Sequence, residues 1–191
     1  MKKYSIILFS IVCVIVISCT NNFNEESILI HKSYGWKIQD TSLITDLDYK
    51  NFKKFKGFVK RIETIVCEDS IPRITLKHKD YIQYIRISNP CYFNYACVLL
   101  KSKNIITIHN NIIDKKGELY PMDSLEFIIK RDLNNYGKIP SYADHPDKLL
   151  FRITYDTDKF EQFPEILETL VNTYDKITQK QDIKIWIEEH T

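Results

Sequence analysis

The chain has 191 residues, and its 27 Lys and Arg nearly balance its 25 Asp and Glu. This balance argues against a nucleic-acid-binding protein, which needs a basic surface. Gly and Pro are scarce, at four and six, whereas Tyr and Phe are abundant. The composition therefore excludes a disordered chain and favours a compact, strand-rich one.

Residues 1–18 have the pattern of a cleavable secretory signal. Lys2 and Lys3 precede an apolar run, Ile6 to Ile17, that is broken only by Ser10. At about 12 residues, this run is shorter than the roughly 20 that a membrane-spanning helix needs. Because Lys2 and Lys3 fall in the signal, the remaining chain carries 25 basic and 25 acidic side chains.

The end of this signal, Val16 to Cys19, resembles the lipobox of bacterial lipoproteins. In that family an aliphatic residue stands three before the cleavage point, a small residue stands directly before it, and a cysteine follows. The resemblance implies that Cys19 receives a diacylglycerol, that its new amino group is acylated with a fatty acid such as palmitate, and that the protein is membrane-anchored. An uncleaved anchor, or an ordinary signal with an incidental Cys19, is the alternative.

Residues 19–27 are polar and are expected to form a tether between the lipid and the body. Glu25 and Glu26 resemble the surface-export signal of lipoproteins from Bacteroides-type bacteria. We expect the outer membrane rather than the inner one, and the surface and periplasmic faces both stay open. No Pro/Gly/Ser-rich linker follows, so residues 28–191 are expected to form a single compact domain.

The segment Tyr34–Trp36 predicts a turn with an aromatic anchor, and Asp40–Asp48 is expected to open a helix with Asp46 as a cap. Tyr49 to Arg61 then interleaves lysines with aromatic residues. This pattern indicates an amphipathic helix whose lysine stems cover apolar surface, ended by Gly57. A patch for anionic lipid head groups or glycan-linked phosphate is the alternative.

The following segments have strand patterns separated by turn residues, which predicts an antiparallel meander. In Arg73–His78, Ile74 and Leu76 are expected to lie on one side. The expected strands are Phe58–Cys67, Arg73–His78, Tyr81–Ser88 and Cys91–Leu100, with turns at Asp69–Pro72, Lys79–Asp80 and Asn89–Pro90.

The C-terminal half alternates strand and helix patterns. Asp123 and Glu126 have the spacing of a capping box, and Pro164 fits the first turn of a helix. The expected elements are a strand at Asn104–Asn110, a turn at Lys115–Gly117, a short strand at Glu118–Tyr120, a helix from Leu125 that Gly137 ends, a loop at Ile139–Asp147, a strand at Leu149–Tyr155, a helix from Asp158 to Ile177 and a strand at Asp182–Glu188. The fold class is therefore α+β: an antiparallel strand-rich N-terminal half followed by a β-β-α-β-α-β unit on a mixed sheet.

The order of elements in residues 104–188 resembles the periplasmic domain of ExbD/TolR-type accessory proteins of energised envelope transport. The matching segments are Ile105–Ile108, Gly117–Tyr120, Leu125–Leu133, Leu150–Asp156, Ile166–Leu170 and Ile183–Ile187. Those proteins carry a spanning helix with a proton-handling carboxylate, where this chain has a lipoprotein signal. The resemblance therefore implies a small envelope domain that dimerises or binds peptidoglycan or another envelope protein, and no proton channel.

Three cysteines remain after Cys13 and Cys19 are assigned to the signal and the lipid. Cys91 and Cys97, on one continuous strand, would lie about 20 Å apart and could not bridge each other. We expect Cys67, Cys91 and Cys97 to be free buried thiols; a bridge from Cys67 to either of the others is the alternative.

Two clusters carry groups that could do chemistry: Asp144, His145 and Asp147 in a Pro-bearing loop, and Asp156 and Asp158 near a strand end. Neither has the spacing of a calcium loop, so turn and capping roles are favoured. The histidines, which include a strand residue His109, show no metal-ligand spacing, and no catalytic signature is present. We therefore expect no catalytic residue, metal or cofactor; if there is chemistry, the loops from Asp144 to Asp158 are the place for it.

These observations favour a lipid-anchored envelope protein that binds a partner or an envelope polymer without catalysis. An immunity or inhibitor lipoprotein that blocks a periplasmic toxin is one alternative. An enzyme of unrecognised type, with converging titratable groups in a deep pocket, is the other.

Overall fold

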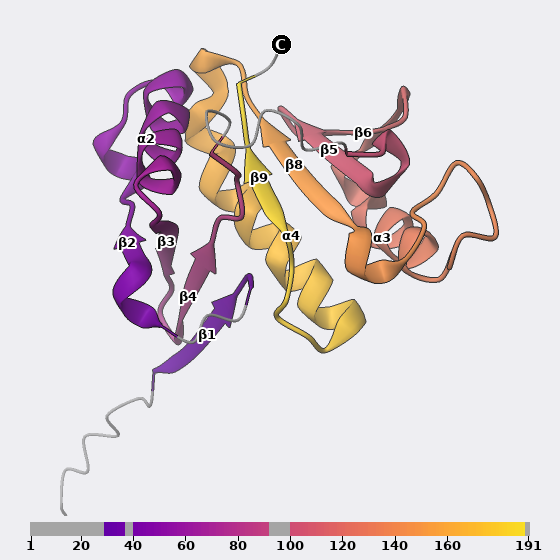
Figure 1. The fold of residues 1–191 in the computed structure, drawn as a ribbon, viewed down its shortest axis with the longest axis horizontal. Helices are drawn as coiled ribbons and strands as arrows, with labels where there is room; N and C mark the ends of the chain where they lie inside the picture. The colour runs from indigo at the N-terminus through magenta and orange to yellow at the C-terminus, as the bar shows by residue number, and fades with distance from the viewer. Residues whose placement is uncertain (1–28, 37–39, 92–99, 190–191) are drawn as a thin grey trace, which may run out of the picture.

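The computed structural model describes residues 29–36, 40–91 and 100–189, apart from the side chains of 157–159. The described residues form nine strands in two mixed sheets and three helices, so the fold class is α+β as expected (Figure 1). The predicted signal 1–18, Cys19 and the tether 19–27 lie outside the described residues. Among the helices that are described, none combines the length and the apolar character that crossing a membrane requires.

The first sheet has the strand order β1-β4-β3-β2. Its central strands β3 and β4 form the expected antiparallel hairpin, with Ile74 and Leu76 buried on one side. The two edge strands pair in parallel, which differs from the expected meander. The bounds are β1 Ile30–Tyr34, β2 Ile44–Asp46, β3 Ile71–Lys77 and β4 Tyr81–Arg86.

The predicted helix opening at Asp40–Asp48 is wrong. Asp40 and Asp48 each cap a single 3-10 turn, and β2 lies between those turns. Asp46 caps nothing; its carboxylate accepts two hydrogen bonds from Arg73, at 2.6 and 2.8 Å. The many short polar residues of this segment favour turns, which explains why it does not continue as a helix.

The segment Phe58–Cys67, expected as a strand, is part of helix α2, Phe55–Cys67, and Gly57 lies inside it. The buried residues Phe55, Phe58, Ile62 and Ile65 recur every three or four positions, so the helical period outweighs the strand propensity of the β-branched residues. A Cβ at Gly57 would meet Phe52 at an ordinary 3.7 Å, so that glycine is not a structural break.

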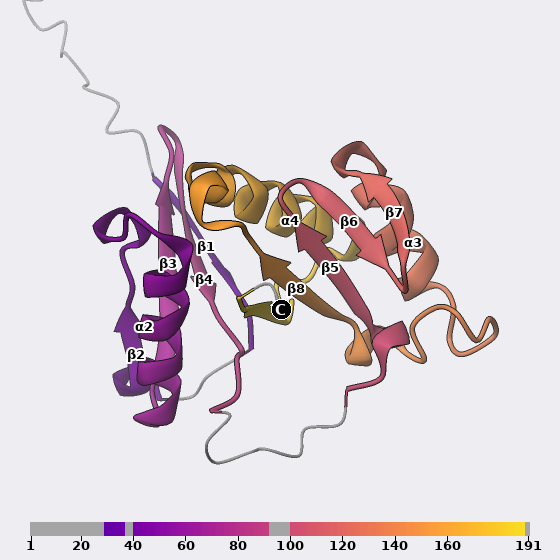
Figure 2. The same cartoon turned by 90° about the horizontal axis from the view of Figure 1, so that it is seen from above.

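The second sheet has the order β7-β6-β5-β8-β9, in which β5, β8 and β9 are parallel and β6 and β7 antiparallel. Helices α3 and α4 lie on one face of it (Figure 2). The bounds are β5 Ile105–His109, β6 Ile112–Lys115, β7 Glu118–Pro121, α3 Leu125–Leu133, β8 Leu150–Thr154, α4 Phe163–Thr178 and β9 Ile185–Ile187.

This half follows the expected order with one addition, the strand β6. The expected capping box before α3 is wrong, because no side chain caps its amino end. Glu126 instead pairs with Lys130 at 2.6 Å and with Lys176 of α4 at 2.8 Å. Its carboxylate therefore links the two helices rather than closing the first turn of α3.

Backbone and side-chain hydrogen bonds join the segment that follows β4 to strand β9 of the second sheet. Ser88 N donates to Ile185 O at 2.8 Å, and the side chain of Asn89 exchanges two hydrogen bonds with the backbone of Ile187. A continuous set of buried apolar residues includes members of both sheets and all three helices.

A disulfide joins Cys67, at the end of α2, to Cys91, beyond β4, with their Cα atoms 4.8 Å apart. The expectation of free thiols is therefore wrong for these two residues, and Cys97 lies outside the described residues. The β3–β4 hairpin brings the two cysteines together by turning the chain back beside the end of α2.

Replacing both Cys67 and Cys91 with serine should lower the free energy of unfolding by about 3 kcal/mol, because a closed loop of this length restricts the unfolded chain. The sequence separation across the bridge is 24 residues. Urea unfolding in oxidising buffer measures the effect. Reductant should bring the wild type to the stability of the double variant; equal stability of the two proteins without reductant contradicts the prediction.

Candidate functional site

The turn after β1 presents a tryptophan to solvent. Tyr34 is buried, and its hydroxyl donates to Asp175 at 3.0 Å; burial first and then this contact raise its pKa, so it stays a donor. Gly35 has φ +102°, and a Cβ there would lie 2.8 Å from the carbonyl oxygen of Arg86. The expected turn is thus present with Tyr34 as its buried anchor, whereas Trp36 is 70% exposed.

Arg86 holds this turn in place from β4. Its guanidinium donates to Trp36 O at 2.8 Å and to Gly35 O at 3.0 Å, and also to Ser33 Oγ at 2.5 Å. From the other side, Gly35 N donates to Gln181 O at 2.7 Å, in the connection between α4 and β9. The backbone beneath the exposed indole is therefore fixed at several points.

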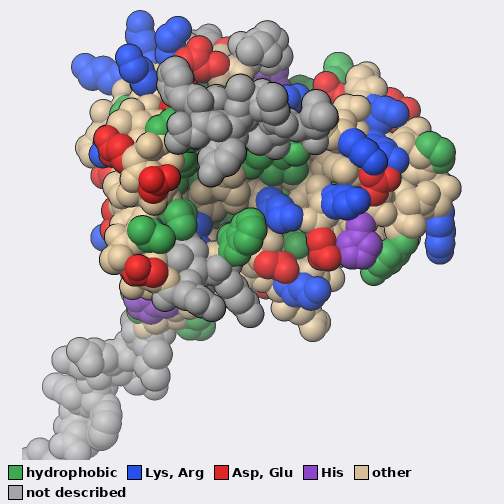
Figure 3. Space-filling model, in the orientation of Figure 1, with side chains coloured by type: hydrophobic (Ala, Val, Ile, Leu, Met, Phe, Trp, Pro, Cys, Tyr) green, Lys and Arg blue, Asp and Glu red, His purple; other side chains and the backbone are tan. Residues whose placement is uncertain are grey.

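Trp36 lines two adjoining hollows of about 760 and 440 Å³, which share Trp36, Asp147 and Lys184, and also a third of about 600 Å³ on the side of Arg86. We call the first two together the Trp36 groove. Figure 3 shows the face of the molecule that carries β9, where hydrophobic, basic and acidic side chains lie next to one another. The remaining lining residues are Lys130, Leu133, Asn134, Tyr136, Pro146, Leu149, Tyr174, Ile177, Thr178, Lys180 and Asp182 in the larger hollow, and Ser88, Leu100, Lys101, Asn104, Ile105, Lys148, Leu150 and Trp186 in the smaller.

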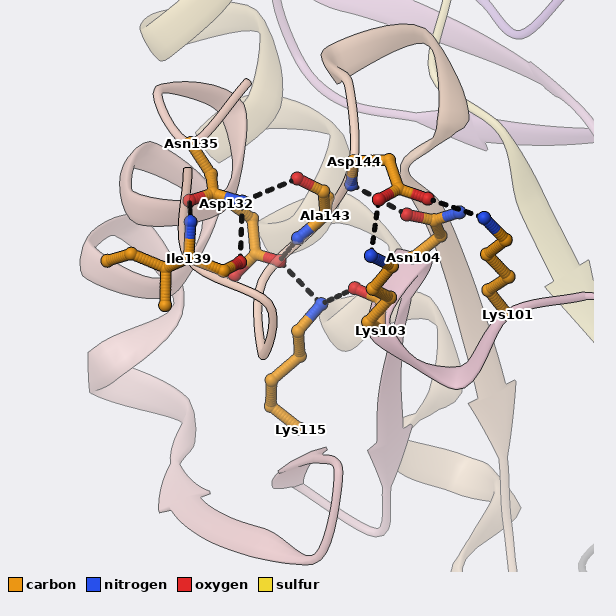
Figure 4. A network of polar contacts seen from close by, with 9 residues as sticks. All are labelled: Lys101, Lys103, Asn104, Lys115, Asp132, Asn135, Ile139, Ala143 and Asp144. Carbon is orange, nitrogen blue, oxygen red and sulfur yellow. Dashed lines mark hydrogen bonds and ion pairs between the residues drawn. The ribbon is translucent and has the colours of Figure 1, made fainter. Parts of the chain in front are cut away.

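One wall of the groove is the long connection between α3 and β8, and a buried ion pair fixes it (Figure 4). Lys115 Nζ lies 2.5 Å from Asp132 Oδ1, and the two side chains are 2% and 0% exposed. Lys115 also donates to Lys103 O at 2.6 Å, while the same Asp132 oxygen accepts Ala143 N at 2.9 Å. Burial lowers the pKa of Lys115, and the hydrogen bond to Asp132 opposes this shift.

Further contacts of this polar network stiffen the same connection. The amide of Asn135 donates to Ile139 O and Ala143 O, at 3.0 and 2.8 Å, and accepts Ile139 N at 2.8 Å. The backbone of Asp144 donates to Asn104 Oδ1 at 2.8 Å. These bonds satisfy backbone groups that a loop of this length would otherwise leave to water.

The first acidic cluster, Asp144, His145 and Asp147, lies in this wall but does not form a reactive centre. Asp144 pairs with Lys103 and, at 3.3 Å, with Lys101, and these lysines lower its pKa from 3.8 to about 2, Lys103 most. His145 Nδ1 accepts Asp147 N at 3.2 Å as a cap. Among the described residues, no group of three His, Cys, Asp or Glu side chains could hold a metal ion.

The second acidic cluster lies at the carboxyl ends of the parallel strands β5 and β8. Asn110 Nδ2 donates to Asp156 Oδ2 at 2.6 Å, and Asp156 N donates to Asn110 Oδ1 at 3.0 Å, so the two residues link the strand ends. His109 Nδ1 lies 2.9 Å from Thr154 Oγ1. The side chain of Asp158 lies outside the described residues.

The basic segment Tyr49–Arg61 forms the approach to α2 and its first turns. Phe55 and Phe58 point into the core, while the lysines lie on the exposed face, where Figure 3 shows basic side chains at the upper left. This arrangement is that of an amphipathic helix; a role in contacting lipid or phosphate stays a prediction.

A third group of side chains had no signal in the sequence, because its members lie far apart along the chain. The rings of His78 and Tyr81 stack with centroids 4.2 Å apart, and Tyr81 donates to Glu168 of α4 at 2.8 Å. His78 Nδ1 lies 3.5 Å from the same Glu168 oxygen. His78 and Glu168 line a hollow of about 680 Å³ together with the Asp46–Arg73 pair.

No protein-family model, curated protein or solved structure matches this chain.

Replacing Lys115 with methionine should cost about 3 kcal/mol, because it removes the close cation from the buried Asp132 carboxylate and leaves only Arg131, at 3.6 Å. Urea unfolding measures this. Lys116→Met, at an exposed neighbouring position, is the matched control and should change stability by less than about 0.5 kcal/mol. The double variant Lys115→Met/Asp132→Leu should recover part of the loss; a single variant as stable as the control would contradict a structural role for the pair.

Replacing Asp144 with asparagine should lower stability at neutral pH and have no effect in strong acid. The folded pKa of Asp144, about 2, lies below the ordinary 3.8, so its contribution is complete above about pH 4 and disappears as pH falls through about 2. Urea midpoints of wild type and variant, measured from pH 6 to pH 2, should converge in that window. A difference that persists unchanged at pH 2 would contradict the assignment.

Proposed function

We propose that this chain is a lipid-anchored protein of the bacterial cell envelope that acts as a non-catalytic binding module, with its ligand in the Trp36 groove. The anchor rests on the Val16–Cys19 lipobox, and the outer membrane on the acidic residues that follow Cys19. A tether of residues 19–27 would let the body reach a ligand beyond the membrane surface.

The observation that carries the binding role is the exposed Trp36 on a fixed backbone. A largely exposed tryptophan offers much apolar area to a ligand, and tryptophan is enriched among residues that dominate binding energy. Because Arg86 and Gln181 already hold the backbone, little ordering of the chain is needed on binding. This combination favours a ligand site over an incidental surface residue.

A second candidate is an accessory role in energised envelope transport, as the ExbD/TolR resemblance of residues 104–188 implies. The support is the order β7-β6-β5-β8-β9 with α3 and α4 on one face, in which the hairpin β6–β7 contains the Gly117 turn. In that role the partner would be an envelope protein, peptidoglycan or a second copy of this chain.

The anchor is tested by metabolic labelling with a clickable palmitate. The wild type should take up label, Cys19→Ala should lose it, and Cys13→Ala, which keeps Cys19, should retain it. Label that persists in Cys19→Ala would contradict lipidation at that residue. Protease treatment of intact cells then distinguishes the surface from the periplasm.

The binding role is tested by sedimenting purified full-length protein in detergent with insoluble cell-envelope polymer. Wild type should sediment, and Trp36→Ala should stay in the supernatant. Phe127→Ala, on α3, is the matched control because Phe127 is 62% exposed but does not line the groove. If Trp36→Ala and Phe127→Ala sediment equally, the assignment of the binding site to the Trp36 groove is wrong.

A further inference from the structure

The Trp36 groove is basic although the chain as a whole is nearly neutral. Its lining contains five lysines, Lys101, Lys130, Lys148, Lys180 and Lys184, against two aspartates, Asp147 and Asp182. Lysines and arginines exceed acidic residues by only two in the whole chain. The groove therefore carries a local excess of positive charge, as the basic segment Tyr49–Arg61 does elsewhere on the surface, and this excess attracts anions.

Neighbouring carboxylates do not cancel this excess. Glu126, beside the groove, is shared between Lys130 and Lys176. Asp144 is likewise shared between Lys101 and Lys103. Each carboxylate thus neutralises one of two lysines, and a net positive charge remains at both ends of the groove.

Aromatic side chains are placed along the same groove. Tyr136, 60% exposed, lines the larger hollow, Trp186 lines the smaller, and Trp36 lies where the two hollows meet. Aromatic rings in one groove suit a ligand with repeated flat units, because aromatic side chains stack on such faces. The C–H faces of pyranose sugars are such units.

The shape and composition also discriminate against other occupants. Lysine is depleted in protein–protein interfaces, so five lysines around one groove are atypical of a protein partner. A membrane surface is broad and would contact a protruding face, whereas Trp36 borders concave hollows on two sides. A linear chain can lie along both hollows at once.

We propose that the Trp36 groove binds a linear polysaccharide that carries carboxylates, with sugar rings on Trp36 and carboxylates near Lys148 and Lys180. This inference rests on the binding role proposed above and adds the chemical class of the ligand. Neither lysine has an ion-pair partner among the described contacts. Their charges are therefore placed to meet an anionic ligand.

The test is titration of full-length protein in detergent with oligogalacturonate, alginate and hyaluronate oligomers, followed by indole fluorescence and calorimetry. At least one acidic oligomer should bind. Where oligogalacturonate binds, its methyl-esterified form, which has the same backbone without the charge, should bind more weakly. For an acidic oligomer that binds, affinity should fall with added salt because the attraction is electrostatic.

Trp36→Ala should abolish binding, and Lys148→Glu with Lys180→Glu should weaken it about tenfold or more. Lys53→Glu with Lys60→Glu, at exposed positions before and within α2, is the charge-matched control and should bind as wild type does. Circular dichroism of each variant verifies that the fold is retained.

Three outcomes would overturn the inference: no binding of any of the three acidic oligomers, equal binding of the acidic and esterified oligomers, or binding that the groove variants leave unchanged. Binding to anionic lipid vesicles that depends on Trp36, without glycan binding, would also overturn it in favour of a membrane contact. If the envelope polymer still sediments the wild type and not Trp36→Ala, the proposed function survives and only the ligand class is wrong.

Discussion

The rest of the structure depends on an aromatic cluster in which α2, on the first sheet, packs against residues at and just before the start of α4. Phe55 and Phe58 of α2 meet Phe160 and Phe163 at the start of α4, with ring centroids 5.2 to 6.5 Å apart, and Tyr155 joins them from the end of β8. Burying each such side chain is worth about 1.5–3 kcal/mol. α2 lies on the first sheet and α4 on the second (Figures 1 and 2), so this cluster packs the two halves together, and hydrogen bonds from β1 and β4 to α4 add to it.

The Trp36 groove exists because the sheets meet in that way. Trp36 comes from the end of β1, Lys184 from the approach to β9, and Asp147 from the connection before β8. Polar contacts then fix two of these segments. Arg86 donates to the backbone of the turn that carries Trp36, and the Lys115–Asp132 pair holds the connection between α3 and β8 that carries Asp147. Apolar packing thus decides the gross arrangement, and buried polar groups decide the local geometry.

Sequence patterns predicted the helices and strands in which the spacing of the apolar residues matches the face that the element buries. The predicted strand Asp182–Glu188 contains β9, Ile185–Ile187, and the predicted helix Asp158–Ile177 corresponds to α4, which begins only at Phe163, after a 3-10 turn. The prediction failed at Phe58–Cys67, where β-branched residues favoured a strand locally and burial against other segments produced a helix. The Cys67–Cys91 bridge was only an open alternative, and the burial of Lys115 had no signal, because both depend on contacts between distant parts of the chain.

The candidate site was even less accessible to sequence reasoning. The segment Tyr34–Trp36 predicted a turn, but nothing in it indicated which ring would be buried and which exposed. The acidic loops were the expected location for chemistry, yet the structure uses Asp144 in ion pairs and Asp156 in a link between strand ends. Only the fold reveals that five lysines separated by up to 83 positions, Lys101 to Lys184, line one groove.

The parallel pairing of β1 with β4 has a mechanical consequence. The predicted tether joins the chain just before Ile30, and the groove begins at the opposite end of the same strand, after Tyr34. If the proposed ligand is held by Lys148 and Lys180 as well as by Trp36, a pull on the tether would pass from β1 to the rest of the body partly through the β1–β4 ladder. That ladder lies along β1 and would be loaded in shear. Arg86 lies at the end of that ladder next to Tyr34, and its hydrogen bonds to the turn would bear part of the load.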